Sequence, residues 1–426
     1  MRSKPGAKIT TLLGILISAV LSASAQHVVK TDTTQFKTLR IDPANAIGGN
    51  VSDIFDQVNY IPLETTTEST FGSISQLAIV DDYYVILDRS TNSILFFTKA
   101  GKFHAKIKGK TSSPSYMIWK FLINKWTKQL AYFTNNFTDI VYCDFDGKVI
   151  KTEKAEDPQT SQRNYWRGYF ISKNEILSCS DYRNLDSLSK GYTPAYRSLI
   201  KYFKSDGTIY STGLPYTRAE GKIDVLGSLA SPLTNFGNDT TFFFSKPYAN
   251  NIYTITPNTI RLSYKLVFPL ANSLPVDFIS NTDYNGKRIF YIEKNQSSIF
   301  YISNCYQLGS NLLFKTGSYS ATRENNLIYN LKSGDLIAYK HILPDEQSFF
   351  LPIYDEIGSS FENYGISACD GEYLYTSLSS LCVFKAKEDN VADKKLKYNA
   401  VLTDYFAKST KDSNPVILQL KIKSDL

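Results

Sequence analysis

The sequence has 426 residues, of which 42% are hydrophobic and 14% are aromatic, with 30 Tyr and 26 Phe against 3 Trp and 2 Met. This length allows one large β-architecture or two to three ordinary domains, and the excess of Tyr and Phe is typical of strands, because flat rings pack on a pleated surface. The formal net charge of +7 falls to about +4 without the three basic residues of the first 25, and such a weak charge argues against a nucleic-acid-binding face.

The start of the chain has the pattern of an export signal. Three basic residues, Arg2, Lys4 and Lys8, precede an apolar stretch over 9–21, and Ala23-Ser24-Ala25 is a small-x-small cleavage site. The apolar stretch is shorter than a typical membrane-spanning helix, and no Cys near the cleavage site offers a lipid anchor. We therefore expect a periplasmic or secreted protein without a transmembrane or lipid anchor, divided into a signal peptide (1–25), an N-terminal extension (26–53) and one large domain (54–426).

The large domain contains six copies of a three-strand pattern. In the clearest copy, an aromatic strand (83–88) is followed by a polar loop, a second strand (94–97) and a turn at Gly101. Six all-β repeats of this length predict a six-bladed β-propeller of four-stranded antiparallel blades. The other copies pair 130–133 with 140–149, 175–179 with 199–203, 241–244 with 250–255, 311–314 with 327–331, and 372–375 with 414–420.

Two kinds of residue mark the loops of these repeats. Gly fits tight turns because it adopts positive φ without steric cost, and it occupies four equivalent turns, at Gly101, Gly147, Gly207 and Gly334. Short polar residues precede five of the strands that follow the polar loops, where their side chains can bond the local backbone; these are Asn92, Asp139, Asn251, Asn326 and Asn414.

The two ends of the domain predict how the ring closes. The strand-like segment 55–64 has no blade of its own, and the last copy lacks its outer strand. We expect residues near 55–65 to supply the outer strand of blade six, where Pro62 is tolerated because an edge strand needs fewer donors. Leu396, Ala400, Val401 and Tyr405 have helical spacing and predict a short helix inserted between 386 and 412.

These features resemble a family of six-bladed β-propellers from the envelopes of Gram-negative gut bacteria, related to NHL and TolB-like propellers. The resemblance rests on Val58-Asn59-Tyr60-Ile61-Pro62-Leu63-Glu64-Thr65, on Asp88 with Ile94-Leu95-Phe96-Phe97 and Gly101, and on Asn414-Pro415-Val416-Ile417. It spans roughly residues 54–424. It implies the fold and the compartment, and it assigns no substrate, because the family has no general activity.

Cysteine and histidine offer little chemistry. The five Cys (143, 179, 305, 369 and 382) share no metal-ligand spacing, and most lie in strand-like runs such as Leu381-Cys382-Val383, so we expect buried free thiols. The three His (27, 104 and 341) form no HxH or HExxH pair, which argues against a zinc site or a catalytic triad.

Carboxylates leave one catalytic alternative open. Some propellers hold a divalent ion at the central channel through Asp, Glu and Asn from several blades, and relatives of that type hydrolyse lactones or esters. Under this alternative the cofactor would be Ca²⁺; otherwise we expect no cofactor. The candidate ligands are Asp81, Asp82, Asp88, Asp181 and Asp370, although Asp81-Asp82 and Asp370-Gly371 fit hairpin turns.

The enlarged loops between second and third strands are the leading candidates for a binding site. Three of them, 180–198, 316–326 and 379–413, should gather on one face together with the connections between blades. Tyr offers an apolar ring and Arg offers fixed donors, which suit sugars, peptides or anionic groups, although incidental loop aromatics would look the same. The candidate ligand-binding residues are Asp88, Arg89, Tyr182, Arg183, Tyr192, Tyr196, Arg197, Tyr319 and Arg323.

We therefore predict a ligand-binding or protein-interaction module with no defined reaction and no identifiable catalytic residue. A glycan, a peptide or an envelope protein is the expected partner, and nucleic acid is not. The alternative is a metal-assisted lactonase-like hydrolase or lyase with carboxylate and amide ligands at the channel mouth. A purely structural subunit of an envelope complex is the third possibility, and an exposed apolar patch on the outer blade surface would favour it.

Overall fold

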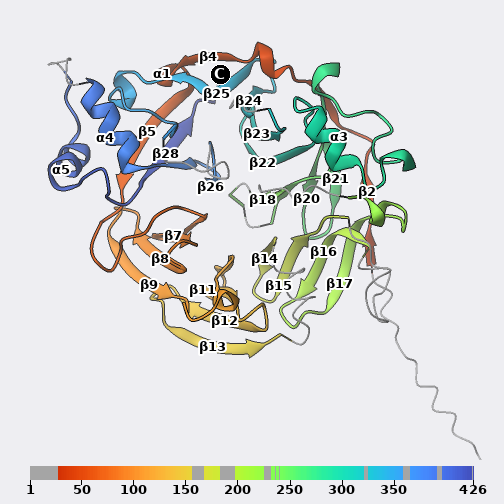
Figure 1. The fold of residues 1–426 in the computed structure, drawn as a ribbon, viewed down its shortest axis with the longest axis horizontal. Helices are drawn as coiled ribbons and strands as arrows, with labels where there is room; N and C mark the ends of the chain where they lie inside the picture. Colours follow the sequence, from red (N-terminus) through yellow and green to blue (C-terminus); the bar gives the residue numbers. More distant parts are fainter. Residues whose placement is uncertain are drawn as a thin grey trace, which may run out of the picture.

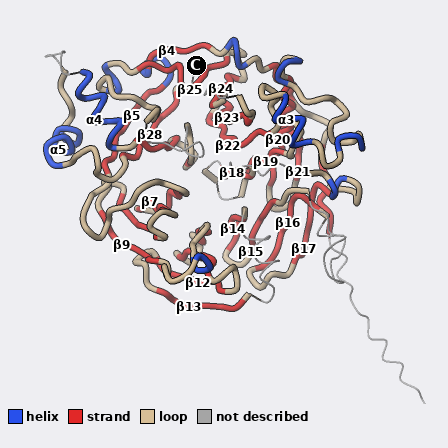
Figure 2. Tube along the Cα trace, in the orientation of Figure 1, coloured by secondary structure: helices blue, strands red, loops and turns tan. Residues whose placement is uncertain are grey.

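The computed structural model describes residues 27–155, 167–182, 197–224, 232–235, 237–238, 240–320, 325–357, 365–390, 396–424 and 426. Six β-sheets surround a central axis, and the chain passes from one sheet to the next around the ring (Figure 1). Strands dominate, and the few helices lie toward the periphery (Figure 2). The predicted six-bladed β-propeller is confirmed.

Each blade is built on four antiparallel strands, counted outward from the axis. Their bounds are β6 (Gln76–Val80), β7 (Tyr83–Asp88), β8 (Ser93–Thr98) and β9 (Phe103–Lys108) in blade one; β10 (Phe121–Asn124), β11 (Gln129–Thr134), β12 (Asp139–Asp144) and β13 (Val149–Lys154) in blade two; β14 (Gly168–Ser172), β15 (Glu175–Cys179), β16 (Ser198–Lys204) and β17 (Ile209–Pro215) in blade three; β18 (Leu233–Asn235), β19 (Phe242–Ser245), β20 (Asn251–Ile255) and β21 (Ile260–Val267) in blade four; β22 (Tyr301–Leu308), β23 (Asn311–Gly317), β24 (Asn326–Asn330) and β25 (Leu336–Leu343) in blade five; and β26 (Ala368–Cys369), β27 (Leu374–Leu378), β28 (Val416–Ile422) and β5 (Phe55–Pro62) in blade six.

The ring closes in blade six, where the first part of the domain pairs with the last. Strand β5 runs antiparallel to β28, with Tyr60 opposite Leu418 and Pro62 opposite Val416. Tyr60 is buried, and its hydroxyl donates to the carbonyl of Leu351, 3.0 Å away. Since β5 is the outermost strand of this sheet, the missing N–H of Pro62 costs little. Both the closure and the edge position of Pro62 agree with the sequence prediction.

Residues 27–50 lie along the outer edges of blades three, four and five and add strands to these blades. Strand β1 (His27–Val29) pairs in parallel with β17, and β2 (Thr31–Asp32) and β3 (Lys37–Arg40) pair with β21. Strand β4 (Ile47–Asn50) then pairs with β25. The segment therefore passes blades three, four and five in order before it enters blade six as β5 (Figure 1).

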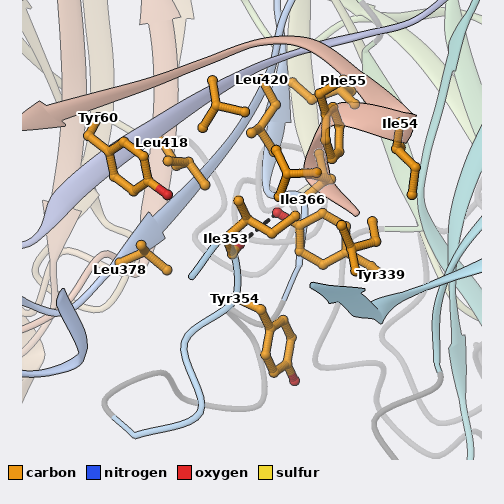
Figure 3. Packing of buried hydrophobic residues seen from close by; sticks show 14 of the residues in the cluster. Ile54, Phe55, Tyr60, Tyr339, Ile353, Tyr354, Ile366, Leu378, Leu418 and Leu420 are labelled. Carbon is orange, nitrogen blue, oxygen red and sulfur yellow. Dashed lines mark hydrogen bonds between the residues drawn. The ribbon is translucent and has the colours of Figure 1, made fainter. Parts of the chain in front are cut away.

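The hydrophobic core lies between neighbouring blades. Between blades five and six, Phe55, Tyr339 and Leu418 are almost fully buried (Figure 3). The Tyr339 hydroxyl donates to the carbonyl of Ile353 at 2.7 Å, so the ring is buried without leaving its polar atom unpaired. The Tyr and Phe excess of the sequence thus has a packing role in this part of the ring.

Helices interrupt the strands at a few positions. Helix α1 (Val51–Ile54) precedes β5, and α3 (Arg288–Lys294) lies in the connection from blade four to blade five. Helices α4 (Ser380–Asp389) and α5 (Ala400–Lys408) both lie between β27 and β28, which confirms the predicted insertion. The insertion starts earlier than expected, and the strand-like reading of Leu381-Cys382-Val383 was wrong. Ser379 caps α4 by accepting from the Cys382 N–H at 3.2 Å, and this cap decides the local structure.

The antiparallel strands divide the loops between two faces of the ring. The turn face carries the turns from first to second and from third to fourth strands, including Gly101, Gly147, Gly207 and Gly334. These four Gly have φ between +78° and +88°, as predicted. The loop face carries the loops from second to third strands, such as 89–92, and the connections between blades, such as 109–120. No helix in the described part of the chain is long and apolar enough to cross a membrane.

Two turns meet on the turn face although their blades are not neighbours. Gly237 follows β18 in blade four, and Gly371 follows β26 in blade six. An added Cβ at Gly237 would lie 2.0 Å from the backbone nitrogen of Gly371, so the two backbones are in direct contact. Both residues have a φ of +95°, a conformation that glycine adopts without steric cost. This contact bridges across blade five at the turn-face end of the axis.

Candidate functional site

The predicted ligand-binding residues are distributed around the loop face. The structure describes five of them: Asp88 and Arg89 in blade one, Tyr182 and Arg197 in blade three, and Tyr319 in blade five. The remaining four lie outside the described residues: Arg183, Tyr192, Tyr196 and Arg323.

Asp88 supports its own loop. Its side chain is fully buried and accepts hydrogen bonds from the Gly72 N–H and from the backbone and hydroxyl groups of Ser90 and Thr91, at 2.6–3.3 Å. Burial raises the pKa of this carboxyl, but the hydrogen bonds outweigh burial and hold the pKa below its usual range. Asp88 thus shapes the loop that presents the next residue, Arg89.

Arg89 and Trp119 form a pair at the junction of blades one and two. The Arg89 guanidinium lies 5.9 Å from the centroid of the Trp119 ring, and its Nε donates to the Trp119 carbonyl at 3.4 Å. The Trp119 side chain is 38% exposed, which is high for so large an apolar group. Arg89 therefore presents its cation beside a partly exposed aromatic ring.

Lys120 follows Trp119 and is the most perturbed cation of the loop face. Its Nζ lies 5.5 Å from the centroid of the Tyr169 ring, which comes from the innermost strand of blade three. Burial, with a smaller contribution from the positive charges of Arg167 and Arg89, lowers the pKa of Lys120 to about 8. Within the described parts of the chain, Lys120 forms no ion pair and its Nζ forms no hydrogen bond.

Arg167 and Asp181 form an ion pair beside Lys120. The Arg167 Nη1 donates to the Asp181 carboxylate at 2.8 Å, and the two side chains are only 14% and 22% exposed. Burial disfavours the charged guanidinium, but Asp181 and the Cys179 thiol outweigh that effect and raise the pKa of Arg167. Because Asp181 is paired with Arg167, the guanidinium largely neutralises the negative charge of its carboxylate.

The Cys179 thiol marks where these cations converge. Burial raises its pKa to about 12, although Arg167, Lys120 and Lys201 all act on it in the opposite direction. The thiol is therefore protonated and unreactive at neutral pH, which fits the predicted role of a small apolar residue. Three cations from three segments of the chain lie close to this thiol. Together with Arg89, whose positive charge lowers the pKa of Lys120, they are called the basic cluster: Arg89, Lys120, Arg167 and Lys201.

Tyr182 lies next along the chain from Asp181 and borders this cluster on the side of blade four. Its ring packs edge-on against Tyr216 at 5.3 Å, and the Lys246 Nζ lies 5.6 Å from its centroid. The hydroxyl is buried and has no hydrogen-bond partner among the described residues. Burial raises the pKa of Tyr182, so the hydroxyl keeps its proton as a donor. A buried, unused donor of this kind is costly, and a ligand acceptor would relieve the cost.

The two remaining described candidates are Arg197 and Tyr319. Arg197 ends the long loop of blade three, and its carbonyl accepts from the Tyr216 N–H at 3.0 Å. Tyr319 is 41% exposed, and its ring packs on Phe300, 5.7 Å away, in blade five. Tyr319 therefore presents a separate aromatic surface further around the loop face.

Sequence reasoning missed Lys120, Arg167 and Lys201. Each of these residues lies in a polar loop or a strand without a recognisable motif. They are far apart in the sequence, so the sequence gives no indication that they lie close together in the fold. The sequence signals were two adjacent aromatic–basic pairs between blades, Trp119-Lys120 and Trp166-Arg167.

The five candidate metal ligands do not meet at one place. Asp81, Asp82 and Asp370 occupy hairpin turns on the turn face, as the turn reading expected, whereas Asp88 and Asp181 lie on the loop face. The carboxylate of Asp370 accepts from the Tyr375 hydroxyl at 2.6 Å. No cluster of three or more His, Cys, Asp or Glu suited to a metal ion occurs within the described ranges.

Comparisons with known proteins agree with the fold. A family model described as a domain of unknown function, DUF4934, matches residues 38–421. A Bacteroides fragilis protein described as exported is similar at a TM-score of 0.59 and 14% identity, over 91% of this chain and 100% of that one. A DUF4221 family member from Bacteroides vulgatus gives a TM-score of 0.42 at 10% identity, over 87% of this chain and 97% of that one. No curated protein matches the chain. At these identities the likeness to solved structures shows the propeller fold alone.

Proposed function

Because the chain belongs to the DUF4934 family, whose function is unknown, we propose from its own residues that it is an exported ligand-binding module. The ligand, a short glycan or peptide chain, binds on the loop face beside the basic cluster. The observation that carries this proposal is the convergence of Arg89, Lys120 and Arg167 with the exposed ring of Trp119.

The combination of Trp119 with the cations of the basic cluster is typical of a binding surface. Aromatic rings bury large area with little loss of conformational freedom, and Arg contributes donors in a fixed geometry. Trp and Arg are also enriched among the residues that dominate binding energies. A second combination of this kind, Lys125 beside Trp126, lies on the turn face, away from the basic cluster.

Residues 1–25 direct export in this proposal, as their basic start, apolar stretch and small-x-small site indicate. The described carboxylates give the lactonase-like alternative no common site, since they are divided between the two faces. The binding module therefore remains the function that the geometry supports best.

The test is a binding screen in which the two exposed tryptophans serve as site and control. Purified mature protein is applied to immobilised oligosaccharides and peptides, in parallel with Trp119→Leu and Trp126→Leu variants. The two side chains are 38% and 42% exposed and lie on opposite faces, so the variants lose similar exposed apolar area. We expect Trp119→Leu to weaken binding about tenfold or more and Trp126→Leu to leave it unchanged.

Two results would overturn the proposal. One is a ligand whose affinity is the same for the wild type and for Trp119→Leu, because the site would then lie elsewhere. The other is a wild-type protein that captures nothing from either class of ligand. Circular dichroism and thermal melting of both variants verify that a loss of binding does not reflect unfolding.

A further inference from the structure

We infer that the ligand carries a carboxylate, which binds at the Nζ of Lys120, and that this carboxylate belongs to an acidic saccharide. The inference rests on the proposed function and specifies the ligand class for the same site. It follows from the burial and charge of Lys120, from the hydrogen bonds that hold its backbone and from the neighbouring ring of Trp119.

Lys120 is a half-buried cation without a counter-ion among the described residues. An ammonium group has three donors, and removing it from water is costly unless a partner supplies charge and hydrogen bonds. Its contact in the described structure is the face of the Tyr169 ring, 5.5 Å away, and a ring face replaces only part of the lost hydration. The nearby acid, Asp181, is bound to Arg167 at 2.8 Å. An incoming anion would therefore meet Lys120, Arg89 and Arg167, and the Asp181 carboxylate is already paired with Arg167.

The backbone on either side of Lys120 is held in place before any ligand arrives. The Ile118 N–H donates to the Asn92 side chain at 2.7 Å. The Phe121 N–H donates to the Gln76 side chain at 3.2 Å, and the Phe121 carbonyl accepts from the same amide at 2.9 Å. Lys120 thus lies between two positions that are fixed to blade one. Such preorganisation lowers the entropy cost of binding, which distinguishes this lysine from an ordinary surface lysine.

The neighbouring ring favours a saccharide over a purely ionic ligand. Trp119 is 38% exposed, and Arg89 lies over its ring, 5.9 Å from the ring centroid. A sugar ring has an apolar face that can pack on an indole while a carboxylate on the same sugar reaches the cations. A peptide carboxylate lacks this rigid combination, so an acidic peptide is the competing outcome of the test.

The probes are trigalacturonic acid, neutral galactotriose and triglutamate, titrated calorimetrically into the mature protein. We expect the acidic sugar to bind at least about tenfold more tightly than the neutral sugar, because a hydrogen bond to a charged group is lost in the neutral one. Lys120→Met should abolish this preference, and Lys120→Arg should restore most of it. Lys110→Met is the matched control, since Lys110 also lies over a ring, Tyr116 at 5.1 Å, in the same connection.

The outcomes separate this inference from the proposed function. If galactotriose binds as tightly as trigalacturonic acid, and binding still requires Trp119, the carboxylate inference fails and the proposed site stands. If triglutamate binds more tightly than the sugar, the saccharide assignment fails. If trigalacturonic acid binds Trp119→Leu and Lys120→Met as well as it binds the wild type, both proposals fail. Absence of binding to all three probes also overturns the inference.

Discussion

Asn92 and Asn414 make the same three hydrogen bonds in blades one and six. Each side-chain oxygen accepts from one backbone N–H of the connection to the next blade, Ile118 for Asn92 and Phe71 for Asn414. Each side-chain nitrogen donates to two carbonyls of that connection, at 2.8–3.2 Å. The sequence predicted that these residues would bond the local backbone, whereas they fasten one blade to the entry of the next.

Loss of this clamp should destabilise the ring. Asn414 is 1% exposed, and Asn414→Ala would remove the partner of the Phe71 N–H and of the Ser69 carbonyl, whereas the Glu64 carbonyl keeps the Ser69 hydroxyl. We expect the free energy of unfolding in urea to fall by about 2–4 kcal/mol. Asn251→Ala is the control, because Asn251 occupies the equivalent position in blade four and, among the described residues, its side chain donates only to the Tyr253 hydroxyl, at 3.5 Å. Equal losses for the two variants would contradict the clamp.

Removal of the closing strand should have a larger effect than removal of the outer strands before it. A mature chain that begins at residue 51 lacks β1 to β4, which only add to finished blades, and its melting temperature should fall by several degrees. A chain that begins at residue 64 also lacks α1 and β5 and exposes β28, so we expect no cooperative thermal transition. Differential scanning calorimetry distinguishes the two; a preserved transition in the shorter chain would refute closure through β5.

The contact between Gly237 and Gly371 can be measured against a second glycine of the same conformation. Gly237→Ala introduces both an unfavourable φ and a Cβ that meets the Gly371 backbone. Gly207→Ala introduces only the unfavourable φ, since Gly207 has a φ of +88° and nothing within 4 Å of an added Cβ. We expect a loss of roughly 1 kcal/mol at Gly207 and a clearly larger loss at Gly237 in urea unfolding. Equal losses would show that the two turns can separate freely.

The acylation rate of Lys120 should reveal its lowered pKa. Only the neutral amine reacts, and its fraction rises with pH until the pH exceeds the pKa. Because the pKa is about 8, the rate at Lys120 should level off above about pH 9. Arg89→Gln removes a positive charge that lowers this pKa, so it should move the plateau to higher pH. Acetylation over pH 7–10, followed by peptide mass spectrometry, gives both curves; an unchanged plateau in the variant would place Arg89 out of electrostatic reach.

Local patterns of the sequence were sufficient for much of the fold. Turn glycines such as Gly147, alternating strands and the blade-less segment ending at Pro62 each depend on a few neighbouring residues, and all three were found correctly. The start of α4 was missed because Leu381-Cys382-Val383 suits a strand as well as a helix, and only the Ser379 cap decides between them.

The candidate site was less accessible to sequence reasoning. Arg89 was selected from its loop, but Lys120, Arg167 and Lys201 come from three other segments, which meet only when blades one to three pack together. Asp88 was selected for its charge, and that charge is satisfied within the loop itself. Clusters assembled from distant segments leave no local pattern, whereas turns and caps do.

The closure of blade six also constrains how the protein reaches this fold. Asn59 and Gln419 are hydrogen-bonded although 360 positions separate them in the chain. Strand β5 is therefore synthesised early, and its partner strand β28 is synthesised only at the end. Pairings of such long range form slowly, and an unpaired strand edge invites association with other chains. Until β28 is available, β5 must be kept from pairing with other chains. We expect the pairing of β5 with β28 to be the rate-limiting late step of refolding.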